Sequence, residues 1–298
     1  MSEQNTETGR AAVWMMGAIA SFSAMAIAGR EAGLTLDTFE IMTYRSMVGF
    51  AIVLLVLTVT KRWSEVKRDR LALHGLRNLA HFIGQNLWFF AVTLIPLAQV
   101  FALEFTSPLW VVLLSPLILG ERLTTVRALS AIIGFVGILI VTRPTPESLN
   151  AGVLTAAGCA VFFALTTVFT KRLTRHEGIL SILFWLTGMQ LVMGLTMAGW
   201  DLDMTLPDSI SLPWILLIGL AGLSAHFCLT TALSLAPATV VVPIDFARLP
   251  FIAVLAMLLY GEELVIWTFL GAALIFVANY LNILDAAGKL GRRLHRSS

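Results

Sequence analysis

The chain has 298 residues, of which 58% are hydrophobic and only 13% are charged. Soluble domains average about a quarter charged residues, so this composition excludes an ordinary soluble domain and indicates a protein whose solvent is lipid. A helix needs roughly 20 apolar residues to cross the hydrocarbon layer, so ten crossings would use about 200 residues and leave no room for a soluble domain. The formal net charge of +2 says little, because membrane proteins distribute basic residues by side.

Apolar runs separated by charged or turn residues predict ten helices. No small-residue cleavage site follows the run that begins at Ala11, so we expect a retained first helix and not a cleaved signal peptide. The first five predicted helices span residues 11–29, 38–60, 71–93, 96–119 and 125–142. The second five span residues 152–170, 179–200, 212–235, 238–260 and 264–284.

Basic residues are unevenly divided between the two sides of these helices. With the N-terminus inside, the cytoplasmic segments carry 15 of the 20 Lys and Arg residues, and the opposite side carries only Arg30 and Arg143. The other three, Arg45, Arg77 and Arg248, lie within spans. Because cytoplasmic loops are enriched in basic residues, this bias predicts a multi-pass protein of the bacterial inner (plasma) membrane with both termini in the cytoplasm.

An internal repeat relates the two halves of the chain. Residues Pro96–Leu123 align without a gap on Pro237–Leu264 at an offset of 141, and both segments contain a Gly-Glu step close to their ends. Residues Ala11–Phe22 match Ala151–Phe162 at an offset of 140. Because each unit holds five helices, an odd number, the second unit enters the membrane from the opposite face. The sequence therefore predicts an all-α polytopic membrane protein of ten transmembrane helices in two inverted repeats, an architecture typical of alternating access.

The five-plus-five arrangement with a Gly-Glu step after helices 4 and 9 resembles the drug/metabolite transporter superfamily, specifically its EamA family, over nearly the whole chain. The resemblance implies two EamA-type five-helix repeats, here residues 1–147 and 148–298. Within this family the chain is similar to bacterial amino-acid exporters, which implies export of amino acids or related small amphipathic metabolites by alternating access. An uptake carrier or a channel for another small metabolite is the alternative.

Two charged pairs are expected inside the membrane. Arg45 and Glu104 lie on helices that enter from the same side, and the rise of 1.5 Å per residue places both roughly 10 to 12 Å below that surface. This matched depth predicts an ion pair, which would serve either as a gate or as a static brace. Asp245 and Arg248 are spaced i, i+3 on helix 9 and are expected to neutralise one another as an internal counterpart.

Polar residues on helix 3 form the leading candidate site. Asn78, His81, Gln85 and Trp88 share one stripe that cannot face lipid, so it either lines a cavity or hydrogen bonds to other helices. His226 on helix 8 occupies the repeat position of Gln85. Two aromatic residues, one on helix 4 and one on helix 9, complete the candidate site. The predicted substrate-binding residues are His81, Gln85, Trp88, Phe105, His226 and Phe246.

Enzymatic chemistry has little support in the sequence. It lacks H-E-x-x-H, G-x-S-x-G and a Gly-rich phosphate loop, so an intramembrane enzyme is a distant alternative. Cys159 and Cys228 have no metal-ligand partner at useful spacing and are expected to be packing residues. The expected partners are a small-molecule solute and the lipid bilayer, with no nucleic acid, no cofactor and no metal. Proton coupling through the buried histidines is left open.

Overall fold

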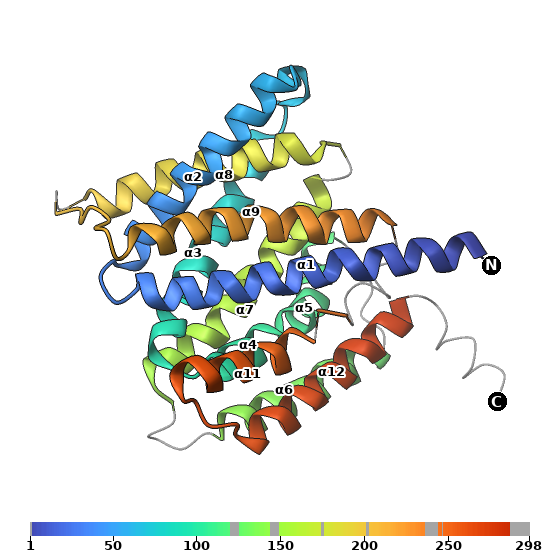
Figure 1. Ribbon diagram of the computed structural model, residues 1–298. Coiled ribbons are helices and arrows are strands. Elements are labelled where there is room, and N and C mark those ends of the chain that lie inside the picture. Colours follow the sequence, from blue (N-terminus) through green and yellow to red (C-terminus); the bar gives the residue numbers. More distant parts are fainter. Residues whose placement is uncertain are drawn as a thin grey trace.

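The computed structural model describes residues 2–119, 125–143, 149–173, 176–200, 203–235, 244–245 and 247–286. Within these residues all regular structure is helical (Figure 1). Up to residue 142 the elements are α1 (Ser2–Ala32), α2 (Thr38–Val59), the 3-10 helix η1 (Trp63–Glu65), α3 (Leu71–Leu94), α4 (Leu97–Glu104), α5 (Ser107–Leu119) and α6 (Thr125–Thr142). From residue 151 they are α7 (Ala151–Leu173), α8 (Ile179–Ala198), α9 (Leu212–Leu235), α11 (Arg248–Tyr260) and α12 (Ile266–Ala286).

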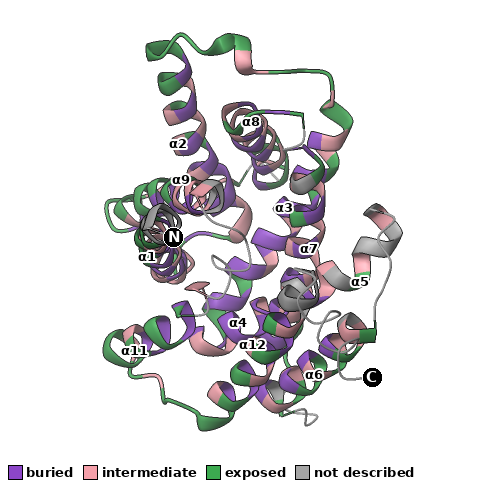
Figure 2. Ribbon diagram, turned by 90° about the vertical axis from the view of Figure 1, so that its right-hand side faces the viewer, coloured by how far each residue is buried: buried purple, intermediate pink, exposed green. Residues whose placement is uncertain are grey.

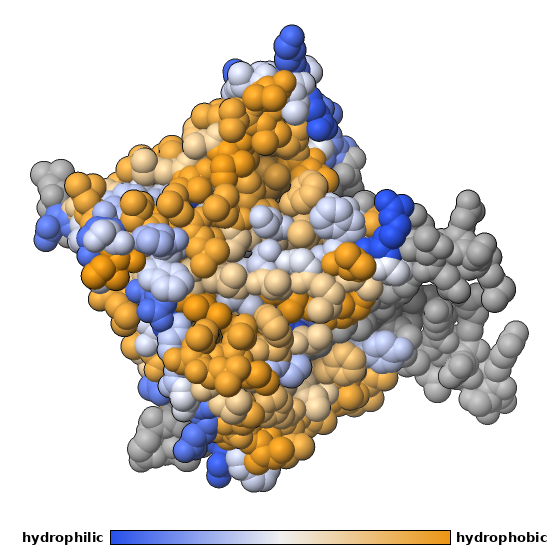
Figure 3. Space-filling view, in the orientation of Figure 1, coloured by the Kyte–Doolittle hydropathy of each residue, from blue (hydrophilic) through white to orange (hydrophobic). Residues whose placement is uncertain are grey.

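Five helices have both the length and the apolar composition that crossing a hydrocarbon layer requires. Among the residues described, they are Gly9–Ala32, Thr38–Val59, Ala151–Thr170, Ile179–Ala198 and Leu212–Leu229. Four shorter apolar segments accompany them, namely Leu97–Val111, which includes the turn between α4 and α5, Ala128–Val141, Arg248–Tyr260 and Ile266–Leu281. Large apolar side chains remain exposed on their outer faces, and Figure 3 shows hydrophobic residues over most of one face of the bundle. Such a surface suits contact with lipid and not with water.

Local signals in the sequence explain several helix ends. Asp37 caps α2 through a capping box, in which its side chain accepts from the Glu40 backbone N–H and the Glu40 carboxylate accepts from the Asp37 N–H. At the end of α11, Gly261 has φ 65° and ψ 23°, the left-handed conformation that glycine adopts without steric penalty. Its repeat counterpart, Gly120, lies outside the described residues.

The predicted fourth helix, residues 96–119, is two helices. α4 ends at Glu104, and α5 begins at Ser107 after a two-residue turn. The physical reason is Pro108, which has no N–H to donate to the carbonyl of Glu104, as an unbroken helix would require. The prediction of one continuous helix over residues 96–119 was therefore wrong. Of the predicted ninth helix, residues 238–260, the structure describes a helix, α11, only from Arg248 onward.

Helices of the first half of the chain pack against helices of the second half. α1 lies beside α9, α3 beside α7, α2 beside α8 and α6 beside α12 (Figure 1). Each of these helices carries buried residues (Figure 2). If each helix is exchanged for its repeat counterpart, the α1–α9 pair becomes the α7–α3 pair, while the α2–α8 and α6–α12 pairs map onto themselves. This pairing is the pattern that a two-fold repeat produces.

The α6–α12 pair depends on small residues. A Cβ atom on Gly271 would lie 2.6 Å from the backbone oxygen of Gly137, and a Cβ on Gly137 would lie 2.8 Å from the oxygen of Gly271. Helices can approach this closely only where neither residue has a side chain.

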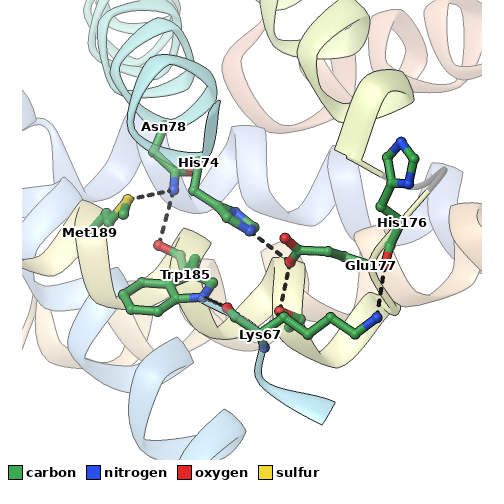
Figure 4. A network of polar contacts seen from close by, with 8 residues as sticks. Lys67, His74, Asn78, His176, Glu177, Trp185 and Met189 are labelled. Carbon is green, nitrogen blue, oxygen red and sulfur yellow. Dashed lines mark hydrogen bonds and ion pairs between the residues drawn. The ribbon is translucent and has the colours of Figure 1, made fainter. Parts of the chain in front are cut away.

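A polar network ties the two halves together at the end of the bundle that carries the α2–α3 connection (Figure 4). The His74 ring nitrogen Nε2 and the Glu177 carboxylate are 2.7 Å apart, and both side chains are at most 1% exposed. The Ser181 hydroxyl donates to the same carboxylate oxygen and accepts from the Lys67 backbone N–H. The indole N–H of Trp185 donates to the Lys67 carbonyl at 2.7 Å.

A matching contact closes the opposite end of the bundle. The Tyr44 hydroxyl donates to the Thr205 carbonyl at 2.6 Å, and the Thr205 N–H donates to the Glu40 carboxylate. Tyr44 and Trp185 are repeat counterparts at an offset of 141, and so are Glu40 and Ser181. Trp185 and Ser181 of the second half thus bond to the α2–α3 loop, and Tyr44 and Glu40 of the first half bond to the loop between α8 and α9. In each half the aromatic donor lies four residues after the polar acceptor.

A second cluster at the Tyr44 end connects three elements. The Arg30 guanidinium pairs with the Glu262 carboxylate and donates to the carbonyls of Val92 and Ile95, each at 2.6 Å. The other oxygen of Glu262 accepts from the Leu97 N–H, at the start of α4. Glu262 thus stabilises the N-terminus of a helix in the other half of the chain.

Candidate functional site

A cavity of about 240 Å³ lies between the two halves, and we call it the central cavity. Both halves contribute to it, the first through α1, α3, α4 and α5 and the second through α7, α9, α11 and Asp245. Its lining residues are Phe22, Met25, His81, Gln85, Trp88, Glu104, Phe105, Ser107, Phe163, Thr166, Thr167, His226, Leu229, Asp245 and Arg248. It thus combines aromatic walls with charged and polar groups, the usual lining of a site for a small organic molecule.

Ionised side chains gather on one wall of the central cavity. The Glu104 carboxylate accepts from the Arg248 guanidinium at 3.1 Å through one oxygen and from the Trp88 indole N–H at 2.8 Å through the other. Arg248 also donates to the Asp245 carboxylate at 3.0 Å. The cluster joins α3 and α4 of the first half to α11 of the second. Each of these charges has an opposite partner, as an apolar surrounding requires.

Three aromatic rings surround the Arg248 guanidinium. Its carbon Cζ lies 4.8 Å from the Phe22 ring centre, 4.9 Å from Phe101 and 5.0 Å from Phe105. At such distances the ring faces attract a cation, and they shield it from lipid. The aromatic rings and the two carboxylates together fix the position of Arg248, which is only 4% exposed.

Histidines and an amide occupy the facing part of the wall. The rings of His81 and His226 have centres 6.0 Å apart, and the Phe22 ring contacts His226 edge-on at 5.8 Å. Gln85 lines the same cavity and accepts from the Arg45 guanidinium at 2.5 Å. Arg45 itself lines a smaller cavity of about 30 Å³ that shares both histidines with the central cavity. The histidines therefore separate the two cavities.

Most of the predicted substrate-binding residues meet in one place. His81, Gln85, Trp88, Phe105 and His226 all line the central cavity. The structure therefore brings together five residues that are up to 145 positions apart in the sequence. Phe246 lies outside the described residues.

The prediction that Arg45 pairs with Glu104 was wrong. In the part of the chain that the structure describes, Arg45 bonds to Gln85 and Glu104 bonds to Arg248 and Trp88. α4 presents Glu104 to α11 and not to α2. The predicted contact between Asp245 and Arg248 is present.

The polar stripe of α3 divides into two parts. Asn78 donates to the Trp185 carbonyl at 3.0 Å, and its own carbonyl accepts from the Gln190 side chain at 2.7 Å. It therefore connects α3 to α8 and does not line the central cavity. His81, Gln85 and Trp88 continue the stripe into the cavity, so both expected roles of this stripe occur on one helix.

Two aromatic residues of the cavity were not among the predicted site residues. Phe22 contacts His226 on one side and Arg248 on the other, and Phe163 lies beside His81 with ring centres 6.2 Å apart. A signal was present, because Phe22 ends the segment that matches Ala151–Phe162 in the second half. Aromatic residues are common in membrane helices, however, and their spacing alone does not tell a cavity ring from a lipid-facing one.

Metal chemistry finds no support in the described residues, which contain no group of three or more His, Cys, Asp or Glu arranged to hold an ion. Cys159 is buried and Cys228 is half-buried, each without a disulfide partner in that part of the chain. The lining of the central cavity combines aromatic rings with charged and polar groups.

These features define a multi-pass membrane protein with a solute-sized cavity between two repeated halves. The sequence matches the EamA-like transporter family twice, over residues 9–143 and 150–284. The chain therefore belongs to the EamA-like transporter family, within the drug/metabolite transporter superfamily. The family resemblance seen in the sequence is confirmed.

Individual relatives carry different cargo names. The chain is 27% identical over 286 residues to an S-adenosylmethionine uptake transporter of Rickettsia conorii, covering 95% of each chain. It is 30% identical over 274 residues to a riboflavin transporter of Brucella anthropi, covering 89% of this chain and 95% of the relative. A solved crystal structure superposes with a TM-score of 0.65 at 20% identity and covers 96% of this chain and 99% of that one, which shows a shared fold.

Proposed function

We propose that this chain is a transporter of the bacterial inner membrane that exports a small amphipathic metabolite, an amino acid or a related compound, by alternating access. The central cavity carries this proposal, because both halves line it and because five residues predicted from the sequence meet there. Carriers built from inverted repeats place their solute between the halves, near the middle of the membrane. The volume of about 240 Å³ lies just below the roughly 300–1,000 Å³ of typical ligand pockets, which favours a small solute.

The cargo class follows from the lining. Phe22, Trp88 and Phe105 offer apolar faces to a ring or an aliphatic chain, while Glu104 and His81 offer polar contacts. The compounds named for the relatives, S-adenosylmethionine and riboflavin, each join a fused heterocycle to a polar chain. An aromatic amino acid has the same two-part character. We therefore take an amphipathic, ring-bearing metabolite as the cargo.

Uptake is the second candidate for the direction of transport. The observation in its favour is the word "uptake" in the name of the Rickettsia conorii relative. Counterflow in reconstituted vesicles, with labelled solute placed first outside and then inside, separates the two directions. A proton gradient imposed in the same vesicles tests coupling through His81 and His226.

We further propose that the chain crosses the membrane ten times, with EamA-type repeats at residues 1–147 and 148–298. The ten spans comprise the five long apolar helices, the four shorter apolar segments and α3. The basic residues support cytoplasmic termini. Reporters fused after Ser298 and within residues 61–70 should behave as cytoplasmic, while one within 201–211 should be periplasmic. A periplasmic C-terminus would contradict the span count.

Transport by site variants tests the proposed site. Uptake of labelled aromatic amino acids into inverted vesicles should follow a saturable concentration dependence, and Gln85→Ala, Trp88→Ala and His226→Ala should raise the half-saturating concentration or change selectivity. The matched control is Phe90→Ala, which removes an aromatic ring that is 43% exposed on the outer face of the same helix as Trp88. Uptake is normalised to the amount of folded protein. If the three variants and the control behave alike, the solute path lies elsewhere.

A further inference from the structure

The central cavity contains buried polar atoms that lack a hydrogen-bond partner. Among the described residues these atoms are both ring nitrogens of His81, the Nε of Arg248 and the Oδ1 of Asp245. His81 and Arg248 are each only 4% exposed. More than nine-tenths of buried polar groups in proteins are paired, so several unpaired atoms around one cavity indicate that something else supplies the missing partners.

Within the cluster of Glu104, Asp245 and Arg248, two carboxylates share one guanidinium. Glu104 and Asp245 each contribute one negative charge, and Arg248, which bonds to both, contributes one positive charge. Both oxygens of Glu104 already accept a hydrogen bond, whereas Asp245 uses only Oδ2 and leaves Oδ1 unpaired. Of the two carboxylates, Asp245 is therefore the one with an oxygen left to accept a further hydrogen bond. A cationic donor makes the stronger hydrogen bond to a carboxylate oxygen.

The surrounding rings favour a cation with an aromatic body. Phe22 and Phe105 lie against the Arg248 guanidinium, so this wall of the cavity already holds one cation between ring faces. A flat ring entering the cavity would meet Phe163 as well, next to His81. Aromatic faces attract cations and stack with other rings.

On the basis of the proposed function, we propose that the transported solute is a ring-bearing amine. Its protonated nitrogen donates to Asp245 Oδ1, while another polar group of the same molecule bonds to His81. Asp245 then determines which solute charge the transporter accepts, whereas His81 contributes to affinity regardless of the charge of the solute. Arg248 is a positioning residue, because its bond to Oδ2 fixes the Asp245 carboxylate and leaves Oδ1 unpaired.

Binding of three indoles with different charged groups on the side chain tests this assignment. Tryptamine is a cation, tryptophan is a zwitterion and indole-3-propionate is an anion, and calorimetry on the purified full chain in detergent measures their dissociation constants. Tryptamine and tryptophan should bind at least tenfold more tightly than indole-3-propionate. Asp245→Asn should abolish this difference, and Asp245→Glu should retain it. His81→Phe should weaken all ligands that bind by the same factor.

The control variant is Ser130→Ala, which removes a buried, unpaired hydroxyl of α6 that does not line the cavity and should leave all three constants unchanged. Gel filtration establishes that each variant is folded. Failure of both amines to bind, or equal binding of all three indoles, would overturn the inference. Saturable transport with no charge preference would refute the role of Asp245 but retain the transporter. Charge-selective binding without transport would support the role of Asp245 but refute the proposal that the chain is a transporter.

Discussion

The contact between Glu104 and Arg248 is open to a quantitative test, because it is the buried ion pair that joins α4 to α11 across the two halves. The Glu104 carboxylate lies 3.1 Å from the guanidinium, and the two side chains are 14% and 5% exposed. Replacing Glu104 with Gln removes the negative charge and leaves one amide oxygen to accept from Trp88. Replacing Arg248 with Gln leaves Glu104 and Asp245 as two carboxylates on one wall.

The two single variants should differ in severity. Arg248 keeps its bond to Asp245 at 3.0 Å when Glu104 is neutralised, so Glu104→Gln should cost only the charge-assisted hydrogen bond, about 1.5–3 kcal/mol. Arg248→Gln strands two charges, and breaking a buried pair in this way costs about 3–5 kcal/mol. The double variant should be less unstable than the sum of the singles by about 1–3 kcal/mol, the range found for residues in one network.

Unfolding of the full chain in mixed micelles, followed by circular dichroism, gives the four free energies of the cycle. A second cycle with Arg45→Gln in place of Arg248→Gln is the control, and it should be additive to within about 0.5 kcal/mol because Arg45 bonds to Gln85. Coupling of Glu104 to Arg45 that exceeds its coupling to Arg248 would refute the arrangement of charges described above.

Three further predictions concern other parts of the bundle. Glu177→Ala should lower the unfolding free energy by about 2–4 kcal/mol, because it leaves the buried His74 ring without its partner, and Glu177→Gln should recover part of the loss in the same assay. Gly271→Val should cost about 1–3 kcal/mol by forcing α12 away from α6, measured as a lower midpoint of thermal unfolding. Bonds from the backbone N–H and the hydroxyl of Ser211 lower the pKa of Asp208, so its stabilisation of the start of α9 is present above its unfolded pKa of about 3.9 and is lost as the pH falls through the lower folded value. Asp208→Ala should therefore speed amide exchange there at neutral pH and change nothing at the acid limit.

The sequence was informative wherever a residue's own chemistry restricts its surroundings. Polar side chains in apolar helices cannot face lipid, and for this reason His81, Gln85 and Trp88 were predicted as candidates and lie at the cavity. The i, i+3 spacing of Asp245 and Arg248 was sufficient to predict their contact, because residues three positions apart stay close even though α11 begins only at Arg248. The role of these residues in transport stays a prediction.

Contacts between helices were less accessible to sequence reasoning. The buried pair of His74 and Glu177 was not predicted, because Glu177 lies in a charged segment that resembles an ordinary solvated loop. Tyr44 is only 8% exposed, and its hydroxyl donates to the Thr205 carbonyl in the loop that precedes α9. Its correspondence to Trp185 is recognisable only once both contacts are known.

By itself, the sequence determined that this protein consists of apolar helices in two related halves and how deep along its helix each polar residue lies. Composition and the rise per residue are sufficient for that, since both are properties of one segment at a time. Only the tertiary structure decided which helices meet, and hence that Glu104 contacts Arg248 and not Arg45. Partner choice depends on the rotation of each helix about its axis and on packing against several neighbours at once. A linear pattern does not specify that rotation for helices that are apolar on nearly every side.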